Sequence, residues 1–540
     1  GLRVREDRHS PYIRTTAGVL ISHGHPVRYY TIDQMRSDPG LLKEAGKADL
    51  VVMIAGVTVP GKYLGGTPAG YPDIRLIASS LPGPVTLLGG PVLFGTSPGG
   101  GTRSFRADLP GFDHLLQGSP AQALDAYLSS EETIRPHAYA EDDIWAVAGA
   151  GIVRQHPLFP HVICEMETAR GCSHGASGGC SFCTEPFYGR PEYRTIAGIR
   201  DEVSALYQQG VRHFRLGRQP DLLTFRAGPG DFPAPCPEIL ASLFTAIREA
   251  APDLKTLHID NINPGTIGRH PDASLEALRA IVQGHTPGDV AAFGMETADP
   301  EVVRVNNLKA DPGLVLEAVR VVNEVGAVRE GGIPHLLPGL NFIAGLAGET
   351  ARTYQLNREF LMQVLNEGLL VRRVNIRQLM PFEGTRAWEE NSLPVSDKAF
   401  RRFKEEVRKQ FDLPMLRKVF PAGTVLRQVI IEVTGQTSFG RQLGSYPILA
   451  GIPLPLPVGA VIDLVVVDHG MRSITALPWP VPINSLPARA LSLIPGLNRP
   501  AITAIQANRP FPDHESLQRI TGLPLPLGLF SFTSPVVPSR

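Results

Sequence analysis

Three cysteines that lie close together in a glycine-rich stretch are the residues of this chain best suited to carry chemistry. Cys172, Cys180 and Cys183 occur within HVICEMETARGCSHGASGGCSFC, which begins at His161 and opens with a plausible strand. The glycines between the cysteines let the backbone bend around an ion or a cluster, and soft thiolates select zinc, copper(I) or iron–sulfur. The three cysteines are therefore candidate metal ligands.

Two kinds of metal site fit this set of thiols. A structural zinc ion normally has four ligands, and Cys164, His161 and His174 are the available candidates for the fourth. A single CxxC without a second, distant pair is nevertheless a weak zinc signature. An iron–sulfur cluster usually has four cysteines, so three would leave one iron open to a small molecule. The spacing alone leaves both alternatives open.

The remaining cysteines and the loop histidine have simpler interpretations. Cys164 and Cys236 are expected to be buried small apolar side chains, as free cysteines commonly are. His174 is expected to be a solvated loop residue rather than a ligand. An odd total of five cysteines argues against a disulfide framework and predicts a reducing, cytoplasmic compartment.

Composition excludes several other classes of protein. The chain has 540 residues, of which 43% are hydrophobic and 19% charged, as is typical of a soluble globular protein with three or four domains. Basic and acidic residues balance at 52 each, which argues against whole-surface binding to nucleic acid or membrane but allows a local basic patch. The longest apolar run, 451–467, is interrupted by prolines and Asp463, so we expect no membrane partner. The sequence opens with Gly1 instead of Met, which fits a missing start.

Strands and helices alternate after the cysteines in the manner of a parallel α/β barrel. Thr195 can cap a helix that runs to Gln209, and VRHFRLG from Val211 predicts the next strand. Further strands are predicted at 254–259, 290–295, 340–344 and 371–376. With the strand before Cys172 these make six parallel units, and ligands in such folds bind at the carboxyl ends of the strands.

The cysteine stretch resembles the radical S-adenosylmethionine (radical SAM) enzymes, whose three-cysteine loop after the first barrel strand holds a [4Fe-4S] cluster. Phe182, before the last cysteine, fits this pattern, whereas seven residues separate Cys172 from Cys180 where the usual pattern has three. The resemblance covers residues 160–395 and implies a partial (β/α)6 barrel. It also implies a [4Fe-4S] cluster held by the three cysteines and S-adenosylmethionine at its open iron.

The resemblance further implies where the cofactor lies. GRQP from Gly217 corresponds to the family's Gly-Gly-Glu-Pro-like turn. The glutamate of GMETADP corresponds to the glutamate of a methylthiotransferase-type stretch that helps to hold the cofactor. FIAGLAGET is similar to the adenine-side strand, and LMPFEGTRA to the barrel-closing segment. The candidate cofactor-binding residues are Gly217, Arg218, Gln219, Pro220, Asp260, Asn261, Glu296 and Gly345. Considered alone, Glu296 would be read as a strand-end surface carboxylate and Asp260 as a helix cap.

Residues 1–129 are predicted to form a Rossmann-like, doubly wound α/β layer. Strands are expected at 50–55, 85–88 and 115–116, and helices at 74–80 and 120–128. The pattern resembles the cobalamin-binding-type domain that precedes many radical enzymes. The Asp-x-His-x-x-Gly loop of that family is missing, because Asp113 and His114 are adjacent, so we do not expect bound cobalamin. Residues 130–159 are predicted to be a linker.

The C-terminal third is predicted to contain nucleic-acid-binding modules. Residues 396–480 read as a helical connector and a small β-barrel that resembles the RNA-binding TRAM module, on which Arg427, Arg441 and Arg472 could contact phosphate, although such arginines are more often solvated. Residues 481–525 resemble a pair of helix-hairpin-helix motifs, followed by a tail at 526–540. Gly496 would let backbone N–H groups meet a phosphate, although Asn498 replaces the usual glycine and such hairpins also mediate protein contacts.

These resemblances together point to an archaeal-type radical SAM protein with a methylthiotransferase-like core. They imply a 5′-deoxyadenosyl radical, a reductant such as ferredoxin or flavodoxin, and a nucleic acid, with RNA favoured, as the substrate. Sulfur insertion is disfavoured, because methylthiotransferases hold a second cluster with three N-terminal cysteines and this chain has none before Cys164. The alternative is a zinc-stapled nucleic-acid-binding or repair accessory protein without radical chemistry.

Overall fold

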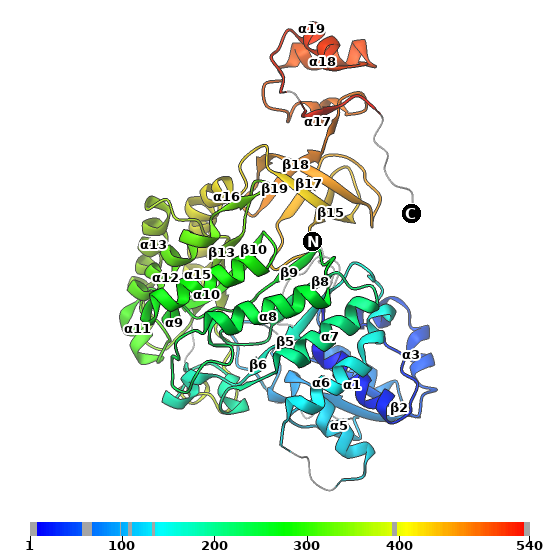
Figure 1. The fold of residues 1–540 in the computed structure, drawn as a ribbon, viewed down its shortest axis with the longest axis vertical. Coiled ribbons are helices and arrows are strands. Elements are labelled where there is room, and N and C mark those ends of the chain that lie inside the picture. Colours follow the sequence, from blue (N-terminus) through cyan, green and yellow to red (C-terminus); the bar gives the residue numbers. More distant parts are fainter. Residues whose placement is uncertain are drawn as a thin grey trace.

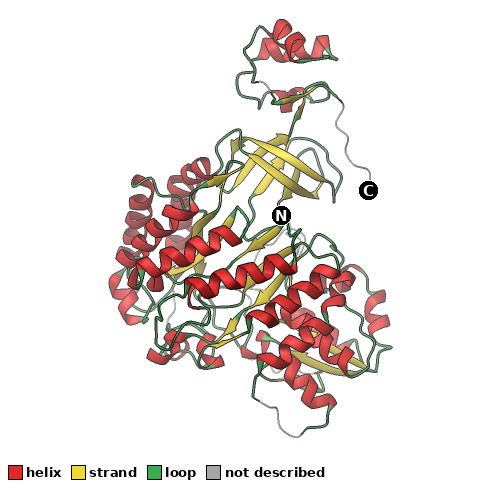
Figure 2. Ribbon diagram, viewed as in Figure 1, coloured by secondary structure: helices red, strands yellow, loops and turns green. Residues whose placement is uncertain are grey.

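The computed structural model describes residues 8–56, 67–97, 99–105, 111–131, 136–390, 397–526 and 528–533. Four parts follow one another through the molecule: an N-terminal α/β layer, a central core, a β-barrel and a group of C-terminal helices (Figures 1 and 2). The barrel separates the C-terminal helices from the core (Figure 1).

The core is built on six parallel strands, as the sequence predicts. They are β5 (Ile163–Glu167), β8 (His213–Gly217), β9 (Thr256–His258), β10 (Asp289–Glu296), β13 (Leu336–Ala344) and β14 (Arg373–Gln378). They form two sheets, β5-β8-β9 and β10-β13-β14, and a parallel bridge between Asn261 and Ala292 joins them. The carboxyl ends of all six strands therefore face the same side of the molecule.

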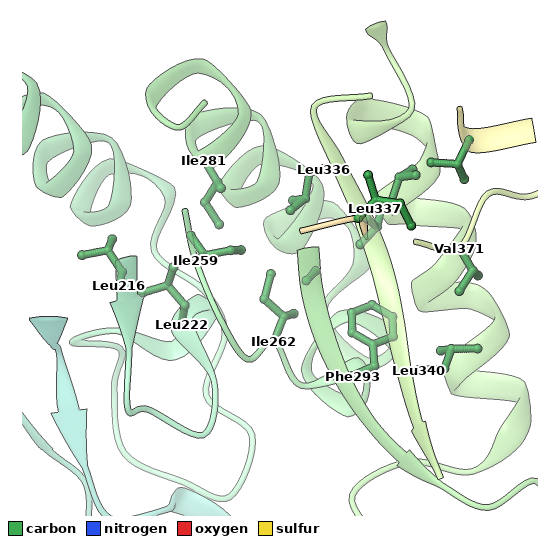
Figure 3. Close-up of a cluster of buried hydrophobic side chains, with 14 of the residues drawn as sticks. Leu216, Leu222, Ile259, Ile262, Ile281, Phe293, Leu336, Leu337, Leu340 and Val371 are labelled. Carbon is green, nitrogen blue, oxygen red and sulfur yellow. The ribbon is translucent and has the colours of Figure 1, made fainter. Parts of the chain in front are cut away.

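Helices cover the outer face of these strands, with α7, α8, α10 and α12 side by side in Figure 1. Their bounds are α7 (Ile196–Gln208), α8 (Pro237–Ala250), α9 (Pro264–Arg269), α10 (Pro271–Gly284), α11 (Pro300–Val305), α12 (Pro312–Gly326), α13 (Ala351–Asn366) and α14 (Arg386–Glu389). The Thr195 hydroxyl accepts from the Gly198 N–H at the start of α7, as predicted. Apolar side chains such as Leu216, Phe293 and Leu340 fill the space between helices and strands (Figure 3).

An additional edge strand comes from the start of the chain, which the sequence did not predict. β1 (Arg8–His9) pairs in parallel with β5, so residues assigned to the N-terminal domain complete the sheet of the core. Short hairpin strands flank the core at β6 (Ala169–Arg170), β7 (Glu192–Tyr193), β11 (Arg329–Glu330) and β12 (Ile333–Pro334).

The N-terminal layer has a parallel sheet of β2 (Leu50–Ile54), β3 (Val85–Gly89) and β4 (His114–Leu116). Its helices are α1 (Pro11–Ser22), α2 (Ile32–Ser37), α3 (Gly40–Ala45), α4 (Tyr71–Ser79) and α5 (Pro120–Leu128). The three described strands lie in chain order, and the doubly wound, Rossmann-like arrangement of this layer stays a prediction. In the predicted linker, α6 (Tyr139–Ala148) packs against α1 and α7.

A buried ion network fastens this layer to the core. Glu202 of α7 accepts from Arg14 of α1 at 2.7 Å through one carboxylate oxygen and from Arg194 at 2.6 Å through the other. Arg194 also pairs with Asp143 of α6 at 2.6 Å. The Arg14 and Glu202 side chains are 0% and 1% exposed, so water cannot stabilise these charges and each must be balanced by its partners in the network.

His213, at the amino end of β8, is expected to make stability depend on pH. Its Nδ1 lies 2.9 Å from the Thr256 hydroxyl oxygen. Burial, assisted by the charges of Lys255 and His161, lowers the pKa of His213 to about 3. As the pH falls below about 6.5, the unfolded chain takes up a proton that the folded chain refuses, so folding loses stability.

We expect the wild type to lose about 1.4 kcal/mol more than His213→Asn when the pH falls from about 7.5 to about 5.5, because asparagine does not titrate. Urea unfolding of both proteins at the two pH values measures this difference. An equal loss in both would show that His213 takes up its proton in the folded state.

The C-terminal part begins with α15 (Asp397–Val407), a π-helical segment (Arg408–Asp412) and α16 (Leu413–Val419). A closed barrel follows, which confirms the predicted small β-barrel: β15 (Val425–Val433), β16 (Ser438–Arg441), β17 (Leu449–Ile452), β18 (Val461–His469) and β19 (Ser473–Pro478). Beyond it lie β20 (Val481–Pro482), α17 (Ala488–Leu491), α18 (Arg499–Asn508), α19 (His514–Thr521) and β21 (Phe530–Ser531).

The turn before α18 has the features that the sequence singled out. Gly496 has a φ of +89°, and the Asn498 side chain caps α18 by accepting from the Ala501 N–H at 2.9 Å. That these helices are helix-hairpin-helix motifs stays a prediction, as do the domain boundaries. Among the described residues, no helix has the length and apolar character needed to cross a membrane.

Candidate functional site

A cavity of about 2750 Å³ opens over the carboxyl ends of the core strands and extends to the N-terminal layer and the barrel. Eight of the sequence-predicted residues line it: Cys180, Cys183, Arg218, Gln219, Pro220, Asp260, Asn261 and Glu296. Cys172, Gly217 and Gly345 do not line the cavity itself: Gly217 is the last residue of β8, and Cys172 and Gly345 lie in loops on the same side of the core. The structure thus gathers the predicted set on one side of the core.

The thiol loop begins directly after β6. Gly171 has a φ of +83°, and a Cβ atom there would lie 2.6 Å from the backbone oxygen of Arg190, so only glycine fits before Cys172. The Cys183 N–H donates to the Cys180 carbonyl at 3.2 Å, and the Glu185 N–H donates to the Cys183 sulfur at 3.4 Å. The turn between the last two cysteines is therefore fixed by backbone hydrogen bonds.

Lys309 joins the three thiols in one electrostatic cluster. Burial raises the pKa of Cys180 to about 12 and that of Cys183 to about 11, and in both cases the Lys309 charge opposes this. Burial would lower the pKa of Lys309, but its interactions with Cys172, Cys180 and Cys183 outweigh burial and raise it. Sequence reasoning missed this lysine, whose one signal is its isolated position in NNLKADP after an apolar helix.

The three candidates for a fourth zinc ligand either form other interactions or lie away from the thiol loop. His174 is buried, so its expected solvation was wrong: its Nε2 lies 2.8 Å from the Asn307 carbonyl and its Nδ1 lies 3.1 Å from the Ser177 hydroxyl. Cys164 is buried within β5, as expected, where it interacts with Arg14 rather than with the thiol loop. His161 interacts with His213 at the amino ends of the strands, on the side of the core away from the thiol loop.

The donor set thus fits a cluster better than a single ion. Among the described side chains, no three histidine, cysteine, aspartate or glutamate residues are placed to hold one metal ion. An iron–sulfur cluster binds its thiolates on separate irons and so needs a wider spacing. Cys236, predicted to be buried, is partly exposed, and its sulfur donates to Glu238 at 3.4 Å, away from the loop.

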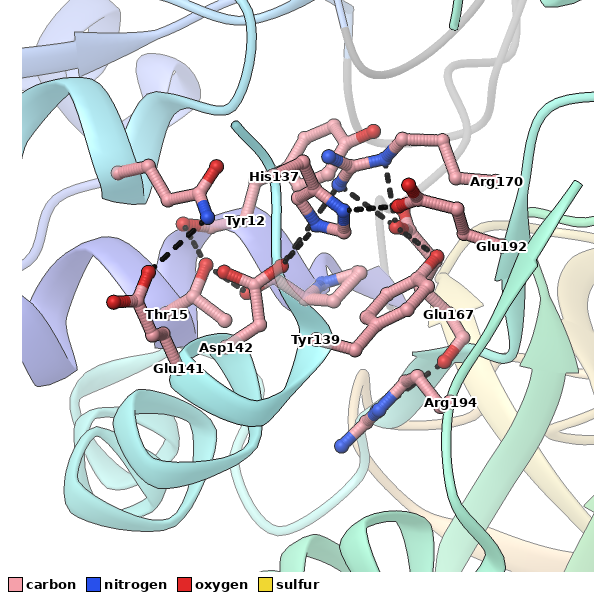
Figure 4. Close-up of polar contacts among 12 residues, drawn as sticks. Tyr12, Thr15, His137, Tyr139, Glu141, Asp142, Glu167, Arg170, Glu192 and Arg194 are labelled. Carbon is pink, nitrogen blue, oxygen red and sulfur yellow. Dashed lines mark hydrogen bonds and ion pairs between the residues drawn. The ribbon is translucent and has the colours of Figure 1, made fainter. Parts of the chain in front are cut away.

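The turn after β8 carries Arg218 instead of an acidic residue. Arg218 has a φ of +57°, donates to the Tyr12 hydroxyl at 2.9 Å and lies 3.7 Å from a carboxylate oxygen of Glu167. Figure 4 shows the polar network around Glu167, which accepts from Arg170 at 2.8 Å and from the Tyr139 hydroxyl at 3.0 Å. Residues of α1 and α6 therefore reach the edge of the cavity.

Asp260 is held between the core and the barrel rather than capping a helix. It pairs with the buried Arg215, which also pairs with Glu165. The Tyr446 hydroxyl, from the barrel, donates to Asp260 at 3.1 Å, and the Ser445 N–H donates to His258 Nδ1 at 2.7 Å. The loop 443–446 thus supplies one wall of the site, which no local sequence pattern indicates.

Two oxygen atoms at this edge are free to meet a ligand. Gln219 Oε1 and Glu296 Oε2 are buried and have no hydrogen-bond partner among the described residues. Glu296 sits at a β-bulge with a φ of +64°, and burial raises its pKa to about 8 against the charges of Lys309 and Arg377. The strained backbone aims this carboxyl group into the cavity.

Further polar groups that sequence reasoning missed point into the cavity from β13 and β14. Asn341 donates to the Phe293 carbonyl at 3.2 Å, and Asn375 donates to the Asn341 side-chain oxygen at 3.2 Å. Asn261 donates to the Gln219 carbonyl at 3.1 Å and joins the turns after β8 and β9. At Gly345, φ is +97° and the N–H donates to Glu349 at 2.7 Å, which fixes the turn after β13.

The family model of the radical SAM superfamily matches residues 166–356, which include the thiol loop and five of the six strand ends. The chain is 39% identical over 493 residues to an uncharacterized protein of Archaeoglobus fulgidus, which covers 90% of this chain and 89% of that protein. An uncharacterized protein of Methanocaldococcus jannaschii is 40% identical over 482 residues, or 86% and 88% of the two chains. This chain therefore belongs to the radical SAM superfamily of enzymes. Within it, the chain groups with these two archaeal proteins over almost its full length.

A solved structure of the radical S-adenosylmethionine methyltransferase TsrM from Kitasatospora setae is also similar, with 15% identity and a TM-score of 0.46 over 68% of this chain and 72% of that one. TsrM has also been solved with cobalamin bound, at a TM-score of 0.42. Likenesses of this size carry no conclusion about function. The absence of bound cobalamin from this chain stays a prediction.

Membership of the superfamily implies a [4Fe-4S] cluster and S-adenosylmethionine, and the residues of this chain fit both. Cys172, Cys180 and Cys183 would hold the cluster, because they share one loop and no described side chain takes a fourth ligand position. Gln219 and Glu296 offer unpaired oxygens to the cofactor beside them.

Proposed function

We propose that this enzyme generates a 5′-deoxyadenosyl radical and uses it to modify a nucleic acid, with RNA favoured. The observation that carries the radical chemistry is the cluster of three thiols and Lys309 at the edge of a cavity into which the candidate cofactor residues point. When bound, the [4Fe-4S] cluster supplies the electron that cleaves S-adenosylmethionine to methionine and the radical. An external reductant such as ferredoxin or flavodoxin is part of the proposal.

The residues of this chain would position the cofactor and exclude water. Gln219 Oε1 and Glu296 Oε2 can accept hydrogen bonds from its ammonium or hydroxyl groups. Asp260, fixed by Arg215 and Tyr446, presents a carboxylate suited to ribose hydroxyls. The N-terminal layer, the core and the barrel all line the cavity, so three parts of the chain surround the place where a reactive primary radical would form and can limit its contact with water.

The choice of a nucleic-acid substrate is supported by the C-terminal part. A closed barrel adjoins the cavity, and a turn with Gly496 and a capped helix lies beyond it. Such turns bind phosphate through backbone N–H groups without reading sequence. Of the three predicted phosphate-binding arginines, Arg427 pairs with Asp463 at 2.7 Å and Arg441 with Glu432 at 3.0 Å, which leaves Arg472 as the strongest candidate.

The test is the appearance of a new nucleoside. Anaerobically reconstituted protein, reduced with dithionite and supplied with S-adenosylmethionine, is incubated with archaeal total RNA, and the nuclease digest is examined by mass spectrometry. We expect a modified nucleoside that is absent without S-adenosylmethionine. Formation of 5′-deoxyadenosine without any change in RNA or in a parallel DNA sample would overturn the substrate assignment.

Tyr446→Phe is expected to weaken S-adenosylmethionine binding about fivefold, because a lost hydrogen bond to Asp260 is worth about 1 kcal/mol. Calorimetric titration of the reconstituted protein measures the dissociation constant. Tyr207→Phe is the matched control, since that hydroxyl donates to Asp253 at 2.9 Å on an exposed surface. If the Tyr446 variant and the wild type bind S-adenosylmethionine with equal affinity, the barrel loop does not contribute to cofactor binding.

A further inference from the structure

One wall of the cavity is strongly basic and has no role in holding the cluster. It consists of side chains from β14 and its preceding residue, from α15, from the π-helical segment and from the barrel loop between β18 and β19. These are Arg372, Arg373, Arg377, Lys404, Arg408 and Arg472, all of which line the cavity. We call them the basic wall.

Few acidic groups balance these charges. Asp412 faces Arg472, Arg408 and Arg373, and Glu296 faces Arg377. In the described part of the chain, no ion pair within 4.0 Å is formed by Arg377, Lys404, Arg408 or Arg472, the four outermost members of the wall. These four positive charges, without an ion pair among the described residues, repel one another inside a concave site and attract an anion.

Tyr446 of the barrel holds the two inner members of the wall, Arg372 and Arg373, in place. Arg372 donates to the Tyr446 carbonyl at 3.0 Å, while its Nε has no hydrogen-bond partner among the described residues. The Arg373 guanidinium stacks on the Tyr446 ring at 4.1 Å. Burial and the neighbouring Arg373 lower the pKa of Arg372 to about 9, as expected of a cation that lacks a counter-charge.

The basic wall is continuous with the candidate cofactor site. Tyr446, on which Arg373 stacks, also donates a hydrogen bond to Asp260. The positive charge of Arg377 interacts electrostatically with Glu296. An anion on the wall would therefore lie beside the place where the radical forms. Several neighbouring positive charges can bind consecutive phosphate groups of a nucleic-acid backbone, because arginine and lysine side chains form strong contacts with phosphate.

We propose that the basic wall binds the backbone phosphates that flank the nucleotide to be modified, an inference that rests on the proposed function. A base must leave its stack to reach a cofactor inside a cavity, and this exposes the neighbouring phosphates of a single-stranded or flipped-out segment. The wall would hold those phosphates while the target nucleoside faces the cofactor. The ligand class is thus single-stranded nucleic acid, bound by charge rather than by sequence.

The test compares two double variants of the same helical segment in the reconstituted protein. Lys404→Gln with Arg408→Gln removes two charges from the wall. Arg401→Gln with Lys409→Gln removes two charges from exposed positions that do not line the cavity. Fluorescence anisotropy with a labelled single-stranded RNA of mixed sequence gives the dissociation constant at several salt concentrations.

We expect the wall variant to bind RNA on the order of tenfold more weakly than the wild type, and its slope of log affinity against log salt to shrink by about 1.4, or about 0.7 per lost phosphate contact. The control variant should keep both values. Arg472→Gln, on an exposed barrel loop, should weaken binding in the same direction and serves if the double variant does not fold.

The outcomes separate this inference from the proposed function. If both double variants bind RNA as the wild type does while RNA is still modified, the basic wall is not the phosphate site and the proposed function stands. If the wild type binds no RNA or DNA but tripolyphosphate raises its melting temperature and not that of the wall variant, the substrate is a small phosphorylated molecule. That result would overturn both proposals.

Discussion

Cys183→Ser is expected to lower the iron content from about four atoms per chain to fewer than one and to abolish cleavage of S-adenosylmethionine. Serine offers a harder oxygen that is not ionised at neutral pH, so the cluster loses one of its three protein ligands. The same result is expected for Cys172→Ser and Cys180→Ser, because all three thiols interact with Lys309 in one cluster. Iron analysis and chromatography of 5′-deoxyadenosine measure both effects.

Cys236→Ser is the control for these variants. Its sulfur is partly exposed and bonded to Glu238, away from the thiol loop, so iron content and cleavage should match the wild type. A Cys183 variant that retains four irons and full cleavage would show that the three cysteines do not hold the cluster.

Glu202→Ala is expected to destabilise the fold by about 3 to 5 kcal/mol, the usual cost of leaving a buried charge without its partner. Two arginines are affected, because Arg14 and Arg194 both lose the carboxylate that pairs with them. The N-terminal layer should separate from the core first, since Arg14 belongs to α1 and Glu202 to α7. Urea unfolding followed by circular dichroism measures the loss.

Glu406→Ala is a matched control for the buried network. Glu406 also pairs with two arginines, Arg358 and Arg402, each at 2.8 Å, but these side chains are 37% and 79% exposed. Pairs in contact with solvent are worth less than about 1 kcal/mol, so this variant should lose little stability. If Glu406→Ala and Glu202→Ala lose similar amounts of stability, burial does not determine how much the Glu202 network contributes to the free energy of unfolding.

The repeating core was predictable because its signals are local. Strands such as β10 and β13 are mostly apolar runs that end in a turn, and Thr195 caps a helix in the way its sequence position indicates. Parallel strands place their carboxyl ends together, and the resemblance to radical SAM enzymes then assigned Arg218, Asp260 and Glu296 to one site there.

Residues that depend on distant contacts were not predictable in this way. Lys309 becomes part of the site because the loop after α11 folds back onto the thiols, and Tyr446 because a barrel loop docks on β9. His174 was expected in solvent, yet the Asn307 carbonyl and the Ser177 hydroxyl enclose it. The two residues of β1 form a strand only because the edge of β5 offers hydrogen-bonding groups.

Radical chemistry in this protein is tested most directly by the stoichiometry of S-adenosylmethionine cleavage by the wild type. The anaerobically reconstituted and reduced enzyme should be brown and should release 5′-deoxyadenosine and methionine in equal amounts, because one bond of the cofactor is broken per turnover. A colourless protein that binds one zinc ion and leaves S-adenosylmethionine intact would show that the three cysteines hold zinc and that the protein has no radical chemistry.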